Sequence, residues 1–340
     1  MTGGRSLGAL RAQRGVALIT VLLVLVIAVA ALTHTITRNR IAVTRTSALL
    51  ANAQLAEFVV GAEAWARIAL ERDFEQDKEL PVSADTALES WSVPALSFNP
   101  DNGKIRINIK DLNSCFNVNN LASAGRESEQ KQIFERLVRN LTGKSDLARA
   151  IQDWVDDGDT PLAPGTEDDG YLGREWAHRT PDAPITDISE LSAVTGMEPE
   201  DWRALRPYLC ALPETGTAIN VNFAPAELLS AIEPQARAAE LESFREADGV
   251  FTERSQLEAY GLNGAGGLVF HSRYFLARIA VQLGDQGDHQ QYWESLLQLD
   301  ERRGLVHVVQ RQRRPFAMVQ MGELLGETAS EISQKSNEIN

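Results

Sequence analysis

The densest group of side chains with ligand chemistry is a run of carboxylates in the middle of the chain. Residues 153–169 contain seven Asp or Glu side chains, and no Lys or Arg occurs between Arg149 and Arg174. Like charges at this spacing raise one another's pKa unless a cation lies among them. Carboxylates on a turn-rich segment suit Ca²⁺ better than Mg²⁺, which demands a strict octahedron, or zinc, which favours His and Cys. The run does not fit the EF-hand spacing, so a solvated acidic loop is the alternative.

The two cysteines, Cys115 and Cys210, are the next candidates. They form neither a C-x-x-C motif nor a zinc-site spacing. In a cytosolic protein they would be two buried thiols, whereas in an extracytoplasmic domain an oxidised pair is expected. A disulfide is therefore predicted if this part of the chain lies outside the cytosol.

The remaining motifs give little support for catalysis. The five histidines, at positions 34, 178, 271, 289 and 307, do not form an H-E-x-x-H pair. The sequence also contains no P-loop. We therefore expect a protein that is not an enzyme.

The charge balance disfavours a nucleic-acid partner. The chain has 33 Lys plus Arg against 47 Asp plus Glu, a net charge of −14, whereas nucleic-acid affinity depends on clustered basic residues. Residues 185–208 resemble a helix-hairpin-helix repeat of DNA-binding proteins, and residues 219–228 resemble the opening of the same unit. The turn, however, carries Glu198, Glu200 and Asp201 where phosphate would bind. We expect no nucleic-acid partner.

These groups follow a long apolar segment at the N-terminus. Residues 16–37 contain no Lys, Arg, Asp or Glu, and as a helix these 22 residues span about 33 Å, enough for a hydrocarbon layer of roughly 30 Å. A cleaved secretory signal would be shorter and would end in a small-residue site. Arg5, Arg11 and Arg14 precede the segment and keep that end cytoplasmic, while the long domain that follows can translocate regardless of charge.

Beyond the span, the pattern predicts an α+β fold. Apolar residues continue at helical spacing to about Arg72, with no Pro before Pro81. Residues 91–109 read as two strands around an Asp-Asn-Gly turn, and residues 274–281 and 305–309 read as later strands. The part between these two groups of strands has helical spacing and frequent caps, which predicts a helical insert.

The N-terminal residues carry a family resemblance. The segment Arg14-Gly15-Val16-Ala17-Leu18-Ile19-Thr20 resembles the class III leader of type IV pilins and type II secretion pseudopilins. The resemblance implies that a prepilin peptidase cuts after Gly15 and methylates Val16. Most such subunits have Glu at the fifth mature position, and Thr20 stands there in this chain. In that departure it resembles the K-type minor pseudopilin of the type II secretion system.

The departure at Thr20 has a physical reason. A carboxylate inside a bilayer is costly unless it is paired. The resemblance implies that its usual partner is the N-terminal amine of the subunit ahead, and a subunit at the filament tip has none ahead of it.

The resemblance also implies the domain organisation. We expect a pilin-like domain in which a long N-terminal helix packs on a small antiparallel sheet, interrupted by a large, mainly helical insert. The expected parts are a leader (1–15), the transmembrane part of the helix (16–37), the rest of the helix with the first strands (38–111), the inserted domain with helix-hairpin-helix-like segments (112–270), closing strands (271–322) and a flexible tail (323–340).

The metal ligands follow from the same resemblance. The K-type subunit is known for calcium in its helical domain, and this chain has a similar D-W-x-D run followed by a G-x-E-D turn. Backbone carbonyls near Thr160 and Gly165 would complete the shell. The implied calcium ligands are Asp153, Asp156, Asp159, Glu167 and Asp168.

The function implied is assembly and contact. The chain would sit in the inner membrane as a single-pass protein with its C-terminal domain in the periplasm. It would join the I- and J-type minor pseudopilins, and through them the other pseudopilins, at the tip of the pseudopilus. There it would prime assembly for the export of folded proteins. The alternative is a membrane-anchored, calcium-dependent binding module that never enters a filament.

Overall fold

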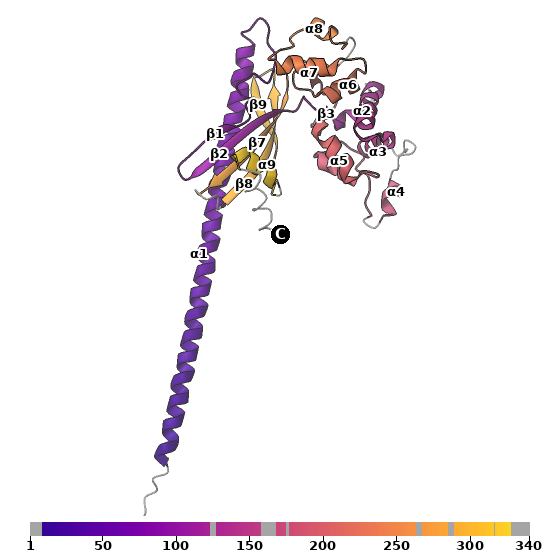
Figure 1. The fold of residues 1–340 in the computed structure, drawn as a ribbon. Helices are drawn as coiled ribbons and strands as arrows, with labels where there is room; N and C mark the ends of the chain where they lie inside the picture. The colour runs from indigo at the N-terminus through magenta and orange to yellow at the C-terminus, as the bar shows by residue number, and fades with distance from the viewer. Residues whose placement is uncertain are drawn as a thin grey trace, which may run out of the picture. The chain divides into compact units, whose positions relative to one another are not determined.

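The structure is a computed structural model that describes residues 9–122, 127–157, 168–174, 177–262, 267–284, 289–315 and 317–327. It consists of a long N-terminal helix, a five-stranded antiparallel sheet and a mainly helical insert (Figure 1). The α+β fold predicted from the sequence is therefore confirmed.

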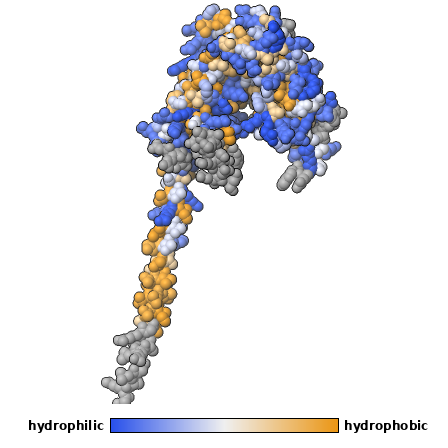
Figure 2. Space-filling view, viewed as in Figure 1, coloured by the Kyte–Doolittle hydropathy of each residue, from blue (hydrophilic) through white to orange (hydrophobic). Residues whose placement is uncertain are grey.

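Helix α1 (Ala9–Asp77) runs about a turn and a half beyond the predicted end near Arg72. It contributes to two units, one up to Glu57 and one from Phe58, which we describe separately. In the first unit the apolar side chains from Val16 to Ile36 are exposed, and Figure 2 shows them gathered along the helix. Among the described residues, α1 is the helix long and apolar enough to cross a membrane.

The hydroxyl groups of the apolar segment are satisfied by the helix itself. Thr20 Oγ1 donates to the carbonyl of Ala17 at 2.9 Å. The side chains of Thr33, Thr35 and Thr37 each donate to the carbonyl four residues earlier, also at 2.9 Å. A hydrocarbon environment offers no water to these groups, so internal bonding is the condition for placing them in lipid.

The sheet has the strand order β1-β2-β7-β8-β9, and each strand is antiparallel to its neighbours. The insert leaves the sheet after β2 and returns at β7, which are adjacent strands, so the sheet closes around the excursion. The bounds are β1 (Leu96–Phe98), β2 (Gly103–Asp111), β7 (Tyr274–Leu283), β8 (His289–Asp300) and β9 (Leu305–Arg313).

Two strand predictions need correction. Residues 91–93 are not a strand, because the buried Trp91 side chain donates from Nε1 to Asp73 Oδ2 at 2.9 Å and Pro94, which has no N–H, follows at once. Strand β8 was not predicted. Its buried positions include the polar Gln291 and Ser295, which remove the apolar alternation that marks a half-buried strand.

The two faces of the sheet pack against different partners. The second unit's part of α1 presents Val59, Ala62, Ala66 and Leu70, all buried and spaced by three or four residues. The other face packs against α9 (Met318–Leu325), whose Met321 clusters with strand residues. Residues 323–327, the described part of the predicted tail, thus include the end of α9, while residues 328–340 lie outside the described part of the chain.

The insert is mainly helical and has its own core. Helix α3, for example, buries Leu147, Ile151 and Trp154, which recur along one face. The elements of the insert are α2 (Glu127–Thr142), α3 (Ser145–Val155), α4 (Asp168–Leu172), α5 (Pro199–Leu205), α6 (Ala226–Ile232), α7 (Ala238–Glu246) and α8 (Arg254–Glu258), the 3-10 helices η1 (Val118–Ala122), η2 (Ile188–Ala193) and η3 (Arg206–Tyr208), and two parallel strand pairs, β3 (Phe116–Asn117) with β4 (Leu209–Cys210) and β5 (Ile219–Asn220) with β6 (Leu268–Val269).

A buried ion pair fixes α1 on the sheet. Glu63 is 4% exposed and lies within the apolar stripe of the helix. Its carboxylate accepts two hydrogen bonds from Arg311 of β9, at 2.7 and 2.5 Å, and one from Ser295 of β8 at 2.9 Å. A bidentate Arg–carboxylate pair sets both the position and the rotation of the helix on these strands.

We predict that Arg311→Met destabilises the protein by about 2 kcal/mol, because Glu63 is left buried with Ser295 as its remaining partner. The full value for a buried pair is not expected, since the Arg311 side chain is 40% exposed. The measurement is denaturant unfolding of the full chain in detergent, followed by tryptophan fluorescence.

The matched control is Arg302→Met in the exposed β8–β9 turn, which should change the free energy of unfolding by less than about 0.5 kcal/mol. The double variant Glu63→Gln with Arg311→Met should recover part of the loss. Equal unfolding curves for Arg311→Met and Arg302→Met would show that the pair does not hold the helix.

Candidate functional site

Three of the five predicted calcium ligands are described by the structure. Asp153 lies in the last turn of α3 and is 1% exposed, and Asp156 follows directly after that helix. Lys131 Nζ lies 3.7 Å from Asp156 Oδ2. Asp168 opens α4 and accepts bonds from Arg179 Nη1 at 2.9 Å and from Thr180 N at 3.2 Å. Asp159 and Glu167 lie outside the described residues, so the ligand set stays a prediction.

The surroundings of Asp153 and Asp156 suit a cation. Both carboxylates lie at the C-terminal end of α3, whose last turn contains no basic residue. The carbonyl end of a helix carries partial negative charge, so two carboxylates there are unfavourably placed by themselves. All the predicted donors are hard oxygens, which is the ligand chemistry that Ca²⁺ prefers.

Aromatic side chains hold the two ends of the acidic segment together. The Trp154 and Tyr171 rings, from α3 and α4, lie 5.2 Å apart edge to face, and His178 lies 5.1 Å from Tyr171. Trp154 is 5% exposed and Tyr171 is fully buried. This packing brings the last turn of α3 close to the start of α4, which carry three of the predicted ligands.

The helix-hairpin-helix-like segment is folded as η2, α5 and η3, with Gly196 in the turn at a φ of 81°. Two acidic residues of its turn, Glu198 and Asp201, bind a lysine of the insert. Lys144 Nζ donates to Glu198 at 2.8 Å and to Asp201 at 2.7 Å. The turn therefore presents carboxylates that bind a lysine of the same domain.

A disulfide joins the residue just before β3 to the last residue of β4. Cys115 and Cys210 are joined, with their Cα atoms 5.8 Å apart and a separation of 95 positions in sequence. The bond packs with Tyr274 of β7 and Leu296 of β8. The cross-link therefore lies where the insert meets the sheet, and closing so long a loop removes much of the unfolded chain's freedom.

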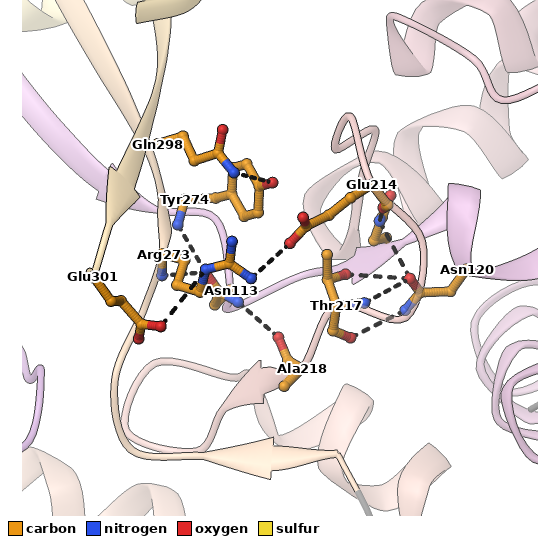
Figure 3. A network of polar contacts seen from close by, with 10 residues as sticks. Asn113, Asn120, Glu214, Thr217, Ala218, Arg273, Tyr274, Gln298 and Glu301 are labelled. Atoms are coloured by element: carbon orange, nitrogen blue, oxygen red, sulfur yellow. Dashed lines mark hydrogen bonds and ion pairs between the residues drawn. The ribbon is translucent and has the colours of Figure 1, made fainter. Parts of the chain in front are cut away.

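Asn113 lies at the point where the chain leaves the sheet (Figure 3). Its Nδ2 donates to the carbonyl of Ala218 at 2.8 Å. Its Oδ1 accepts from the backbone N–H groups of Arg273 and Tyr274, both at 3.0 Å. The backbone carbonyl of Asn113 accepts from Asn220 N at 2.8 Å. One residue thus joins the outgoing chain, the returning chain and the interior of the insert.

Three further asparagines continue this joint. Asn117 Nδ2 donates to Glu214 O at 2.8 Å, and Asn119 bonds to the backbone of Ile185 and Leu212. All three are 1% exposed, and the third, Asn120, accepts from Thr217 N at 3.0 Å (Figure 3). A side-chain amide has both N–H donors and a carbonyl acceptor, so it can form hydrogen bonds with the backbone of two irregular segments at once.

Ion pairs close the rim of the joint. Arg273 Nη1 donates to Glu214 Oε1 at 2.9 Å, and its Nε lies 4.0 Å from Glu301 (Figure 3). Gln298 Nε2 donates to the hydroxyl of Tyr274 at 2.8 Å. These contacts connect the insert with β7, β8 and the β8–β9 turn. These side chains form hydrogen bonds and ion pairs between the insert and the sheet, so the joint sets the orientation of the insert.

Carboxyl groups with raised pKa values gather beside this joint. Burial, then the hydrogen bond with Glu89, raises the pKa of Asp73 to about 8. Burial raises the pKa of Asp111, at the end of β2, to about 7. Asp111 Oδ2 accepts from Ser272 Oγ and, at 3.4 Å, from Asn220 Nδ2. Asp77, Asp85 and His271 lie close by and form a separate group, whose ligand atoms are within 4.8 Å of one another.

No sequence pattern pointed to the groups at the joint. An asparagine-rich run after a strand is typical of an exposed turn, and only the fold shows that these amides are buried. Asp77 and Asp85 are close in sequence, but His271 comes from the far end of the insert, so the group forms only in the fold. Glu63 alone left a signal, because a carboxylate stands at the spacing of an apolar helix stripe.

Comparison with known proteins places these features in a family. Residues 114–214 match the family model of type II secretion system (T2SS) protein K. The chain is 33% identical over 331 residues to the type II secretion system protein K of Pectobacterium carotovorum subsp. carotovorum, covering 88% of this chain and 96% of that relative. It is 32% identical over 292 residues to the protein of the same name from Pseudomonas aeruginosa, covering 81% and 86%.

The fold matches a solved structure as well. A crystal structure of the GspK–GspI–GspJ complex from the enterotoxigenic Escherichia coli type 2 secretion system contains a chain that superposes with a TM-score of 0.66. The match covers 79% of this chain and 99% of that one, at 22% sequence identity. The likeness shows a shared fold, and the relatives show the lineage: the chain belongs to the type II secretion system protein K family.

Proposed function

We propose that this chain is a minor pseudopilin of the type II secretion system. Residues 16–37 would anchor it in the inner membrane, with the C-terminal domain in the periplasm. It would cap the tip of the pseudopilus and prime its assembly for export of folded proteins across the outer membrane. The observation that carries the proposal is α1, a helix that begins with a span of lipid length and ends as the helix on which the sheet packs.

Thr20 supports a place at the tip. Its hydroxyl donates to Ala17 O of its own helix, so it needs no hydrogen-bond partner from a neighbouring subunit. A carboxylate at this position would be costly in lipid unless a cation from another subunit met it. A subunit with Thr20 is therefore suited to the one place where no subunit lies ahead.

The partners follow from the family. The solved relative is in a complex with GspI and GspJ. We propose that I- and J-type minor pseudopilins bind this chain, that other pseudopilins follow below it, and that its leader is a substrate of the prepilin peptidase. The insert, held to the sheet by the Asn113 joint and the disulfide, would block a further subunit from stacking above it.

Calcium is proposed to hold the acidic segment. Asp153, Asp156, Asp159, Glu167 and Asp168 would bind the ion, with hard oxygen donors throughout. The ion would add its positive charge to that of Lys131 at the carbonyl end of α3, whose last turn contains no basic residue. Its work would be to order the segment between α3 and α4.

The role in a filament is tested by Gly15→Val, which should block cleavage of the leader. We expect the variant to keep its leader, residues 1–15, and to abolish secretion. An unprocessed subunit stays in the membrane and cannot be added to a filament. The measurements are intact mass of the purified chain and the amount of exported protein in the medium.

The matched control is Gly8→Val, the same substitution within the same leader, which should be processed and should support secretion. If Gly15→Val remained unprocessed and still supported secretion, the chain would act as an anchored binding module, and the filament proposal would be overturned.

The calcium site is tested by melting the full chain in detergent with calcium, with magnesium or with EDTA, at matched ionic strength. We expect calcium to raise the melting temperature by several degrees, since ligand binding to the folded state alone stabilises it. Asp153→Asn and Asp168→Asn should each lose most of this rise. Asp146→Asn, an exposed acid at the other end of α3, should keep it. Equal melting curves in calcium and EDTA would remove the calcium proposal.

A further inference from the structure

A second cation site is suggested by three side chains near the end of α1. Asp77 is the last residue of that helix, Asp85 lies in the loop that follows, and His271 stands just before β7, where the chain returns from the insert. His271 Nδ1 lies 3.7 Å from Asp77 Oδ2 and 3.5 Å from Asp85 Oδ1. Among the residues that the structure describes, this is the group of three potential metal ligands that comes together within 4.8 Å.

The spacing fits a small metal ion. In a tetrahedral zinc site with bonds of about 2.0–2.1 Å, neighbouring ligand atoms lie about 3.3–3.4 Å apart. The two distances from the imidazole are within a few tenths of an ångström of that separation. The group lines a cavity of about 220 Å³, and the side chains of Asp77 and Asp85 are 14% and 9% exposed. A metal bound there would be only partly hydrated.

Asp77 and Asp85 share one ion-pair partner. Asp73, Lys78 and Glu301 also line the cavity. The basic residues nearest in sequence are already paired: Lys78 Nζ lies 2.7 Å from Glu75 Oε1, and Arg273 Nη1 lies 2.9 Å from Glu214 Oε1. Among the described residues, His271 is the ion-pair partner of both Asp77 and Asp85.

A buried oxygen gives an independent indication. Asp111 is 2% exposed, and its Oδ1 has no hydrogen-bond partner among the described residues. Ser272 connects this carboxylate with the site, because its Oγ donates to Asp111 and its N–H donates to Asp85 Oδ2 at 2.6 Å. The backbone N–H groups of Asn113 and Ser114 stabilise the charged form of this carboxylate only in part, because burial still raises its pKa. Since Ser272 links Asp111 to Asp85, a divalent cation bound at Asp85 would offset part of the cost of burying this carboxylate.

The ligand types indicate which metal would bind. One imidazole nitrogen with two carboxylate oxygens suits zinc and its neighbours among the transition metals, whereas Ca²⁺ and Mg²⁺ favour oxygen alone. The backbone N–H of Ser272 already orients Asp85, as outer-shell donors do for ligating carboxylates.

We propose that Asp77, Asp85 and His271 form a binding site for a divalent transition metal of the zinc type, with water in the remaining position. The ion would tie the end of α1 to the chain that returns from the insert. The site is separate from the acidic segment in ligands and in metal type, and it does not depend on the proposed function.

The test is a zinc titration of the full chain, purified in detergent without a polyhistidine tag and measured calorimetrically with calcium in excess. Excess calcium occupies the acidic segment, so the heat measured on adding zinc does not come from that segment. We expect one zinc ion to bind per chain. His271→Asn and Asp77→Asn should each weaken the affinity for zinc by about tenfold or more. Cobalt bound in place of zinc should give the visible absorption of a four-coordinate site. The two ligand variants should lose this absorption.

The matched control is His289→Asn, an exposed histidine at the start of β8, which should leave the affinity unchanged. Far-ultraviolet circular dichroism without metal shows whether a variant is folded, and if one ligand variant does not fold, the other decides. Absence of zinc binding by the unsubstituted chain, or wild-type affinity in a folded ligand variant, would overturn the proposal.

Discussion

Asn113 stands where the chain leaves the sheet, and its side chain and carbonyl make four hydrogen bonds with segments that return from far along the sequence. An insert of this size between two neighbouring strands must leave and return at fixed points. The chain is irregular just after β2 and just before β7, beyond the regular ladder of the sheet. The buried asparagines supply the missing partners for that backbone. The disulfide then adds a covalent tie at the same place.

The same end of the molecule's second unit also concentrates charge. Asp111 lies at the end of β2, and its pKa is raised to about 7 because it is buried. Asp85 and Asp111 share Ser272 as a donor, so the carboxyl groups are part of the joint's hydrogen bonding. Hydrogen bonds to backbone therefore position the insert, while a surplus of carboxylates beside them leaves room for a cation.

Sequence reasoning reached the elements that have local signals. The span, the hairpin around Asn102, β7 and β9 follow from charge-free length, turn chemistry and alternation. Strand β8 escaped because it buries polar residues, and the joint escaped because a buried asparagine looks like an exposed one in sequence. Ligand groups such as Asp77 with His271 depend on tertiary contacts alone, so no periodicity could reveal them.

The Asn113 joint holds the insert in one orientation on the sheet. Spin labels on Ser97→Cys in β1 and Ala239→Cys in α7, both exposed, would report it through the distribution of their separation in the full chain. We expect one narrow distribution of the distance between the labels. Asn113→Ala should broaden it, and Asn140→Ala, at an exposed asparagine in α2, should leave it unchanged. A distribution equally narrow in the Asn113→Ala chain would contradict it.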